Sequence, residues 1–386
     1  MPAMLKWIIL GGGIHGSTIA SHLIKKKKVT PDQIRIIDPN AEPLAEWKKR
    51  TGFIDMPYLR SPGVHHLDTD PFSLKAYGKK YGTETDFYGA YSRPSLYLFN
   101  EHSDRLFSET TLMDCWYQGM AEKVTRKNQA WLITLKDQTV FESENLVIAT
   151  GPNRKLHLPD WGHKAKEKAP SQVSHVFEAV PPSEGPFVVI GGGISAAHLV
   201  TRLSKEFPGQ VTQLTRHPYR VHAFDSDPGW LGPKYMEGFK KLNDYRVRRD
   251  TITQARHRGS IPSDLQNRLH WLQKEQSYQL LLDETESFTY KNGTFTLHQK
   301  SGNLLEVKTI YFATGFSHEL MDTPWLNALI RDEKLKCAHC GFPVVKENLS
   351  WCDHLYVSGP LAELELGPSS RNIIGAMKAA ERITAI

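Results

Sequence analysis

Three glycines near the start of the sequence have the spacing that dinucleotide-binding proteins use. Gly11, Gly13 and Gly16 form the pattern G-x-G-x-x-G directly after the apolar run Trp7–Leu10. In this pattern the first glycine permits a tight turn, the second lets the backbone approach a pyrophosphate, and the third lets a helix pack closely on a strand. The helix N-terminus then offers free N–H groups to phosphate oxygens. The spacing therefore predicts a dinucleotide site.

A second segment repeats this chemistry about 180 residues further along the chain. Gly191, Gly193 and Ala196 follow the apolar run Val188–Ile190 as the variant G-x-G-x-x-A. Each unit closes with the sequence Ala-Thr-Gly. Besides the first three glycines, the predicted nucleotide-contacting residues of the two turns and their closing sequences are Gly151, Gly191, Gly193, Ser195, Ala196, Thr314 and Gly315.

The residues that follow the second strand of each unit differ in charge. In the first unit the segment Gln33–Asp38 ends in Asp38, whose carboxylate can accept hydrogen bonds from a ribose diol and would repel a 2′-phosphate. At the corresponding point of the second unit the sequence has Arg216 and no acid. Arginine binds a 2′-phosphate through charge-assisted hydrogen bonds. We therefore expect FAD in the first unit and NADPH in the second.

The elements around the two turns recur in the same order, which indicates an internal duplication. Each unit reads as strand, glycine turn, helix, strand, insertion, three-strand meander and final strand. The meanders fall at residues 130–143 and 288–307, the second with the hairpin dipeptide Asn292-Gly293, and residues 264–282 are predicted to be helical. These elements predict an α/β fold of two Rossmann-like domains, with the NADPH domain (166–324) inserted into an FAD domain (1–165 and 325–386).

The last part of the sequence is predicted to return to the first domain. It reads as a strand at Leu355–Ser358, a turn at Gly359-Pro360 and a helix from about Pro368. The N-terminus of that helix could point at the flavin and stabilise negative charge on the reduced ring.

The overall composition excludes several other classes of function. The 386 residues carry a net charge of +6, with scattered basic residues, so we expect no nucleic-acid partner. No segment reaches the roughly 20 apolar residues of a membrane span, and we expect no membrane partner. Four cysteines do not make a disulfide framework, which favours the cytoplasm. The sequence leaves open whether the protein forms a homo-oligomer.

The doubled turns, the two Ala-Thr-Gly sequences and the ending "VSGP…GP…N" resemble the class B flavin monooxygenases. The stretches 47–82, 171–180 and 216–230 are most similar to the branch that includes the lysine and ornithine N-hydroxylases. The resemblance implies that FAD is also contacted by Trp47, Gly359, Pro360 and Asn372. Two substrate-holding features of those enzymes are missing: residues 53–72 contain no lysine, and Gly229–Gly232 contains no Asn-Glu. These differences put ornithine and lysine in doubt as substrates.

The chemistry that the resemblance implies needs NADPH, FAD, O2 and a small-molecule substrate. NADPH reduces FAD, the reduced flavin reacts with O2, and a C4a-peroxyflavin transfers one oxygen to a nucleophilic nitrogen or sulfur. The candidate catalytic residues beside the flavin are Arg60, Ser61, His65 and His66. We expect one of the two adjacent histidines to face the flavin and the other to face solvent. His15, inside the first turn, could touch the ribityl chain.

The cysteines allow other interpretations. Cys337 and Cys340 form a C-x-x-C pair, with Cys352 and His354 downstream, which could hold zinc or act as a redox disulfide. We favour unpaired cytosolic cysteines and predict no metal site. Two alternative functions remain open: an NADPH-dependent thiol-disulfide or electron-transfer reductase, and a non-catalytic redox sensor that binds dinucleotides.

Overall fold

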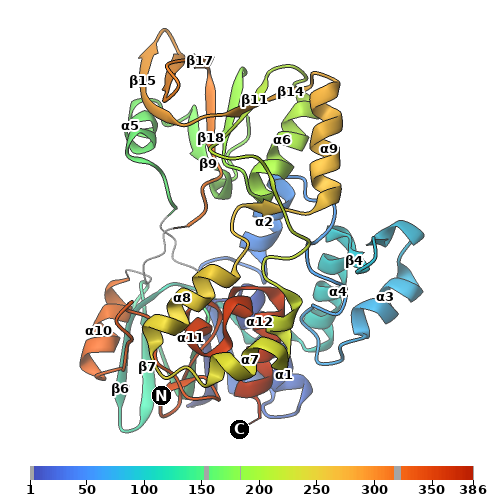
Figure 1. Ribbon diagram of the computed structural model, residues 1–386. Helices are drawn as coiled ribbons and strands as arrows, with labels where there is room; N and C mark the ends of the chain where they lie inside the picture. The colour runs from blue at the N-terminus through green and yellow to red at the C-terminus, as the bar shows by residue number, and fades with distance from the viewer. Residues whose placement is uncertain (1–3, 152–155, 183, 317–322, 386) are drawn as a thin grey trace.

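The computed structural model describes residues 4–151, 156–182, 184–316 and 323–385. The chain forms two lobes, each built around a mainly parallel sheet, and the second lobe is inserted into the first (Figure 1). The lower lobe of Figure 1 contains a sheet with the order β19-β20-β8-β1-β2-β5, and β6 and β7 extend it from β8. Its strands are β1 (Leu5–Leu10), β2 (Ile34–Asp38), β5 (Trp116–Gln118), β6 (Ala121–Lys127), β7 (Ala130–Leu135), β8 (Val140–Ile148), β19 (Ser350–Cys352) and β20 (Leu355–Val357).

The upper lobe contains a five-stranded sheet in which every pair is parallel, with the order β14-β11-β10-β18-β9. A separate antiparallel meander, β15-β16-β17, lies beside it. Asn292 and Gly293 join β15 to β16 with φ of 52° and 78°, the left-handed conformation that a type I′ hairpin turn needs. The strands are β9 (Val173–His175), β10 (Phe187–Ile190), β11 (Val211–Thr215), β14 (Tyr278–Leu282), β15 (Thr285–Lys291), β16 (Thr294–Gln299), β17 (Leu304–Val307) and β18 (Thr309–Phe312).

The central strand of each sheet leads directly into a helix that is buried against it. Trp7–Leu10 of β1 and Phe187–Val189 of β10 are buried, as continuous apolar strands covered on both faces should be. The helices that follow β1 and β10 are α1 (Ile14–Lys25) and α6 (Ile194–Glu206). These observations confirm the predicted α/β fold with two Rossmann-like sheets. Among the described residues, no helix is both long enough and apolar enough to cross a membrane.

The remaining helices cover the sheets and form the side of the lower lobe. Helix α12 packs along α1, and α9 packs along α6. Figure 1 shows α3 and α4 projecting from one side of the molecule. The bounds are α2 (Ala45–Phe53), α3 (Ser73–Tyr81), α4 (Leu96–Glu109), α5 (Asp160–Lys168), α7 (Pro233–Lys240), α8 (Tyr245–Ala255), α9 (Ser263–Lys274), α10 (Pro324–Asp332), α11 (Glu363–Leu366) and α12 (Ile373–Ile383).

Two predicted helices differ from the structure. The helix predicted over 264–282 ends at Lys274, and residues 278–282 form β14, which pairs with β11. A short apolar run such as Leu280–Leu282 has no periodicity that separates a strand from a helix. The helix predicted from Pro368 begins with a single 3₁₀ turn, Pro368–Arg371, and α12 starts at Ile373 after Asn372.

Some segments pack on a different lobe from the one that their place in the chain suggests. Helix α5 packs against β9 and β15 of the upper lobe. Helices α7 and α8, from the inserted part of the chain, pack on the lower lobe through a cluster that includes Met236, Phe239 and Leu364 (Figure 1). The domain limits at 165/166 and 324/325 stay predictions.

Candidate functional site

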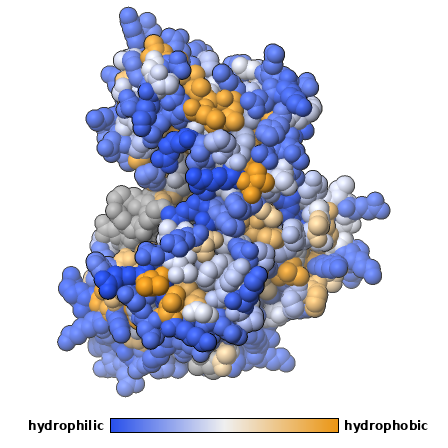
Figure 2. Space-filling view, in the orientation of Figure 1, coloured by the Kyte–Doolittle hydropathy of each residue, from blue (hydrophilic) through white to orange (hydrophobic). Residues whose placement is uncertain are grey.

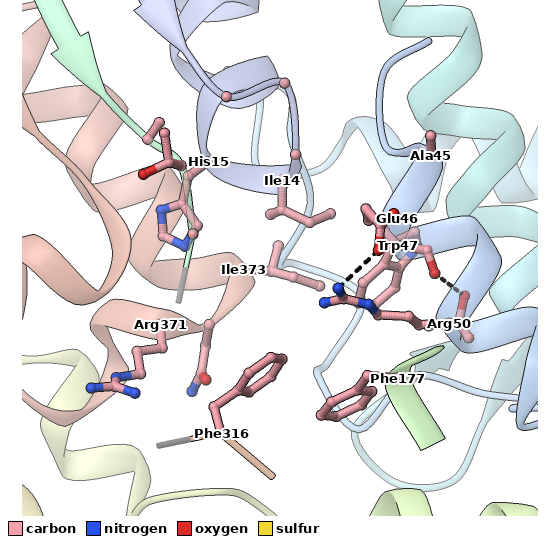
Figure 3. Close-up of a pocket in the computed structure, with 18 of the residues that line it drawn as sticks. Ile14, His15, Ala45, Glu46, Trp47, Arg50, Phe177, Phe316, Arg371 and Ile373 are labelled. Carbon is pink, nitrogen blue, oxygen red and sulfur yellow. Dashed lines mark hydrogen bonds and ion pairs between the residues drawn. The ribbon is translucent and has the colours of Figure 1, made fainter. Parts of the chain in front are cut away.

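A cavity of about 1710 Å³ lies where the two lobes meet, and its lining includes the first glycine turn and the start of the helix that follows the second. Gly11, Gly12 and Gly13 line it from the lower lobe, and Ile194 and Ser195, at the start of α6, line it from the upper lobe. Figure 2 shows the face on which the lobes meet at a narrow waist, and Figure 3 shows part of the cavity lining. The first turn and the N-terminus of α6 therefore face one shared space.

The first turn has the geometry that its glycine spacing predicts. Gly11 has φ of +102°, and a Cβ on it would lie 2.5 Å from the carbonyl oxygen of Ala149. A Cβ on Gly16 would lie 1.7 Å from the carbonyl oxygen of Gly11, so α1 can pack against this turn only with glycine there. Gly13, the residue before α1, has an ordinary φ of −75°, and no atom lies within 4 Å of the position of its Cβ. The space beside Gly13 fits a pyrophosphate at the helix N-terminus.

Asp38 lies at the end of β2 beside this turn and lines the cavity. One carboxylate oxygen accepts a hydrogen bond from the Gly12 N–H at 2.7 Å, and the other accepts from the backbone and side chain of Asn40 at 2.9 and 2.8 Å. These bonds fix the carboxylate at the rim of the turn. A ribose diol placed there would meet an oriented acceptor.

His15, in the first turn of α1, connects the glycine turn to the residues that follow β20. Its Nδ1 lies 2.8 Å from the Ser358 hydroxyl, and its ring lies against Gly359, which has φ of +64°. Burial lowers the pKa of His15 to about 4, against a smaller opposing effect from the Arg371 backbone, so the ring is neutral at pH 7. His15 and Arg371 lie on one side of the cavity in Figure 3, and Trp47 and Arg50 lie on the other.

The second turn repeats the geometry of the first. Gly191 has φ of +143°, and its Cβ would lie 2.6 Å from the Ala313 carbonyl oxygen. Gly193 precedes α6, and the nearest atom to its Cβ position is the Cα of Gly259, at 3.4 Å. The loop before β13 (Ser260–Ile261) therefore lies against the second turn.

The structure places an acid beside Arg216 that comes from a distant part of the sequence. Its guanidinium lies 3.8 Å from the carboxylate of Glu284, which follows β14, and its side chain is 75% exposed. Glu284 is 68 positions further along the sequence (284 − 216), so only the pairing of β11 with β14 brings the two residues together.

The residues predicted beside the flavin occupy different environments. Arg60, Ser61 and His65 line the cavity. His66 is buried, its Nε2 lies 3.1 Å from the Pro71 carbonyl oxygen, and its Nδ1 accepts a hydrogen bond from the Asp68 N–H. The expectation that one of the histidines faces solvent is therefore wrong, because both are buried. The Asp68 and Pro71 contacts fix the turn that presents His65.

The cavity lining includes only part of the set predicted from the sequence. The predicted residues among the lining are Gly11, Gly13, Asp38, Trp47, Arg60, Ser61, His65, Gly151, Ser195 and Asn372. The predicted residues outside it are Gly16, His66, Gly191, Gly193, Ala196, Arg216, Thr314, Gly315, Gly359 and Pro360. Of these residues outside the lining, Gly16 and Gly191 shape the two glycine turns.

An aromatic pair in the cavity was missed by sequence reasoning. Phe177 and Phe316 stack with ring centroids 4.8 Å apart and an angle of 13°, and the Arg50 guanidinium lies 5.4 and 5.7 Å from the two centroids (Figure 3). Glu46 holds Arg50 through an ion pair of 2.8 Å. Phe316 directly follows the second Ala-Thr-Gly sequence, and this position is the one feature of the sequence that could have indicated its place in the site.

The four cysteines lie away from this chemistry. All four are free thiols in the described part of the chain, and none of them lines the cavity. No group of three or more histidine, cysteine, aspartate or glutamate side chains among the described residues is arranged to hold a metal ion.

This fold is that of the flavoproteins with two dinucleotide-binding domains, and over its full length it matches class B flavin monooxygenases. The structure matches the ornithine N-hydroxylase of Kutzneria sp. 744, solved with reduced FAD, NADP⁺ and L-ornithine, with a TM-score of 0.78 and 14% identity over 99% of this chain and 98% of that chain. It matches the FAD-bound cadaverine monooxygenase of desferrioxamine biosynthesis from Erwinia amylovora with a TM-score of 0.76 and 15% identity over 100% of this chain and 95% of that chain.

The same fold also occurs in a reductase. The bacillithiol disulfide reductase from Bacillus cereus matches with a TM-score of 0.57 and 15% identity over 99% of this chain and 98% of that chain. No protein-family model matches the sequence, and no curated protein does. At sequence identities this low, the structural similarity establishes the fold and leaves the substrate undefined. The substrate must therefore be inferred from the residues of the site.

Proposed function

We propose that the protein is an FAD- and NADPH-dependent monooxygenase that places one oxygen atom of O2 on a nucleophilic nitrogen, or sulfur, of a small molecule. The observation that carries this proposal is one cavity lined by the first glycine turn and by the N-terminus of α6, the helix that follows the second turn. Electron transfer from one dinucleotide to another needs their reactive rings in one space from which bulk water is kept out. We place the enzyme in the cytoplasm.

The first turn and its neighbours are the residues that would hold FAD. Gly13 leaves room for the pyrophosphate, Asp38 offers an acceptor to the ribose, and His15 and Asn372 lie beside the inner part of the cavity. Bound there, FAD would supply the redox chemistry that passes electrons from NADPH to O2. The chain's own task is to orient the cofactor and to shape the space above it.

The second turn and Arg216 are the residues that would hold NADPH. Gly193 and Ser195 lie at the N-terminus of α6, where backbone N–H groups favour phosphate oxygens. Arg216 at the end of β11 is placed for the 2′-phosphate.

The His65 imidazole is the polar group that we assign to contact with the substrate in the cavity. Burial, and more weakly the neighbouring His66 and Lys378, lowers the pKa of His65 to about 4. At pH 7 the ring is neutral, so it can accept a hydrogen bond from an amine that approaches as the nucleophile. Val64, Tyr91 and Leu231 also line the cavity and give it apolar surface for the carbon part of a substrate.

The test measures where the electrons of NADPH go. The FAD-loaded protein is mixed with NADPH and O2 and offered ornithine, lysine, cadaverine, simple monoamines and thioethers in turn. A substrate should raise NADPH consumption, lower the hydrogen peroxide released per NADPH, and yield a hydroxylamine or sulfoxide. If all electrons appear as hydrogen peroxide with every compound, the proposal is overturned.

A thiol-disulfide reductase is the competing function, because the matching structures include bacillithiol disulfide reductases. The position of the cysteines outside the cavity lining speaks against it. The Cys340→Ser variant separates the two: a monooxygenase should keep its NADPH consumption, and a reductase that uses the C-x-x-C pair should lose it. A non-catalytic sensor would consume NADPH no faster than free FAD does.

A further inference from the structure

A charged cluster lies at the edge of the upper lobe beside the second glycine turn. The Glu284 carboxylate is 3.8 Å from the Arg216 guanidinium and 4.0 Å from the Lys300 ammonium. All three side chains are largely exposed, with 75% of Arg216, 67% of Lys300 and 48% of Glu284 open to solvent. One carboxylate is thus shared by two cations, and a ligand can reach each of them.

The backbone fixes this cluster next to the nucleotide turn. A Cβ on Gly192 would lie 2.8 Å from the Thr215 hydroxyl and 3.5 Å from the His217 ring, so the end of β11 lies against the turn. Strand β14 pairs in parallel with β11, and the Asp283 N–H donates to the Thr215 carbonyl oxygen at 3.1 Å. Arg216 and Glu284 therefore leave the same edge of the sheet side by side.

Lys300 is anchored to this edge as well. Its backbone N–H donates to the Glu284 carbonyl oxygen at 2.7 Å, and the Asp283 carboxylate accepts hydrogen bonds from the Ser301 N–H and hydroxyl. The hairpin that joins β16 to β17 is thus held against the end of β14. The ammonium of Lys300 lies 4.0 Å from the Glu284 carboxylate.

We infer that Glu284 determines how strongly the second site discriminates between NADPH and NADH. A carboxylate at this edge accepts hydrogen bonds from a 2′,3′-diol and repels a 2′-phosphate, whereas Arg216 and Lys300 attract the phosphate. Because Glu284 engages both cations, a 2′-phosphate must compete with it for them. The site should therefore bind both nucleotide forms with only a modest preference for the phosphorylated one. This inference rests on the proposed function only in taking the second turn as the nicotinamide dinucleotide site.

The experiment measures binding and needs no turnover. The FAD-loaded protein is titrated by calorimetry with 2′,5′-ADP and with 5′-AMP, which differ only at the 2′ position. Glu284→Gln should tighten 2′,5′-ADP binding about fivefold, because it removes one close like charge and frees both cations. It should weaken 5′-AMP about two- to threefold, because an amide is a poorer diol acceptor than a carboxylate. Lys300→Ala should weaken 2′,5′-ADP and leave 5′-AMP unchanged.

Glu286→Gln is the matched control, since it makes the same charge change two residues along the chain, and it should leave both affinities within about twofold. If Glu284→Gln leaves the ratio of the two affinities unchanged while both ligands bind, the inference is overturned. If neither ligand binds the wild-type protein, the assignment of the second turn to a nicotinamide dinucleotide fails, and that result bears on the proposed function. Loss of oxygenation alone affects neither titration.

Discussion

Gly13 and Gly16 belong to one turn, yet a Cβ would meet different surroundings at the two positions. Gly16 is needed by the fold, because its Cβ would overlap the carbonyl oxygen of Gly11 at 1.7 Å. Gly13 has an ordinary φ and open space where a Cβ would go. Nothing within the described residues demands a glycine there, so under the proposed function the need for glycine comes from the cofactor.

Alanine substitutions separate these two reasons. Gly13→Ala should change the free energy of unfolding of the FAD-free protein by less than about 1 kcal/mol, while FAD binds at least about tenfold more weakly because a methyl group meets the pyrophosphate. Gly16→Ala should lower the free energy of unfolding by about 1–3 kcal/mol. Urea unfolding of the FAD-free variants and fluorescence titration with FAD measure both effects. Unchanged FAD affinity in Gly13→Ala would contradict the placement of the cofactor.

The residues of the glycine turns could be predicted because their chemistry is local in sequence. The placement of Glu284 beside Arg216 could not, since it depends on which strand pairs with β11. The stack of Phe177 on Phe316 escaped for the same reason: the two rings come from segments on opposite sides of the inserted lobe's sequence. His66 shows the converse, because its sequence context suggested chemistry while the structure uses it to hold a turn.

At the scale of elements, one arginine joins the loops of the two lobes. The Arg60 guanidinium donates hydrogen bonds to the carbonyl oxygens of His222, Ala223 and Phe224 at 2.7, 3.1 and 2.8 Å, and to the Ser260 hydroxyl at 2.8 Å. Ser260 adjoins Gly259, which lies against the second glycine turn. The loop that carries His65 is thereby tied to the loop that faces Gly193. We interpret Arg60 as a positioning residue.

Replacement of Arg60 by lysine should slow the reduction of bound FAD by NADPH about ten- to a hundredfold, because one ammonium cannot satisfy four acceptors and a displacement near 1 Å has effects of that size. Stopped-flow absorbance measures this rate, and reduction by dithionite should stay unchanged. Arg93→Lys is the control: Arg93 also crosses between the lobes, but through a single 2.7 Å ion pair with Asp264 that lysine can keep. Equal rates in Arg60→Lys and wild type would refute the positioning role.

The order of the elements along the chain followed from the sequence, and their ends did not. Apolar runs, glycine turns and the Asn292-Gly293 hairpin are local patterns, and the structure contains each of them. Helix α9 ends at Lys274 because the following residues complete a sheet, which is a tertiary demand that helix periodicity does not record. The packing of α7 and α8 on the lower lobe likewise depends on side-chain contacts between distant segments.

At the scale of the whole molecule, buried neutral histidines should make the protein sensitive to mild acid. Burial lowers the pKa to about 4 in His15, His22, His65, His102, His175 and His198. The folded pKa lies below the unfolded value of about 6.5, so the unfolded chain takes up protons first as the pH falls. Stability should therefore decline between about pH 6.5 and pH 4.

Urea unfolding followed by circular dichroism at pH 7.5 and pH 5 measures this decline. Each such histidine can remove up to about 2 kcal/mol at pH 5, so a few of them consume a large part of a typical folding free energy of about 5–15 kcal/mol. Carboxylates whose pKa is lowered by their partners stop stabilising the fold only at lower pH. The loss of stability caused by the histidines can therefore be measured separately from the loss caused by the carboxylates. A constant free energy of unfolding from pH 7.5 to pH 5 would contradict the burial of these side chains as neutral groups.

The pairing of β20 with β8 has a consequence for how the protein is made. All strands of the upper sheet are translated after β8 and before β20. A nascent chain can therefore finish the inserted lobe while the backbone of Leu146–Ile148 still lacks its neighbour on one side. Exposed strand edges recruit other chains into aggregates. Slow translation between these two strands should thus lower the yield of usable protein, and a chaperone that shields nascent chains should restore it.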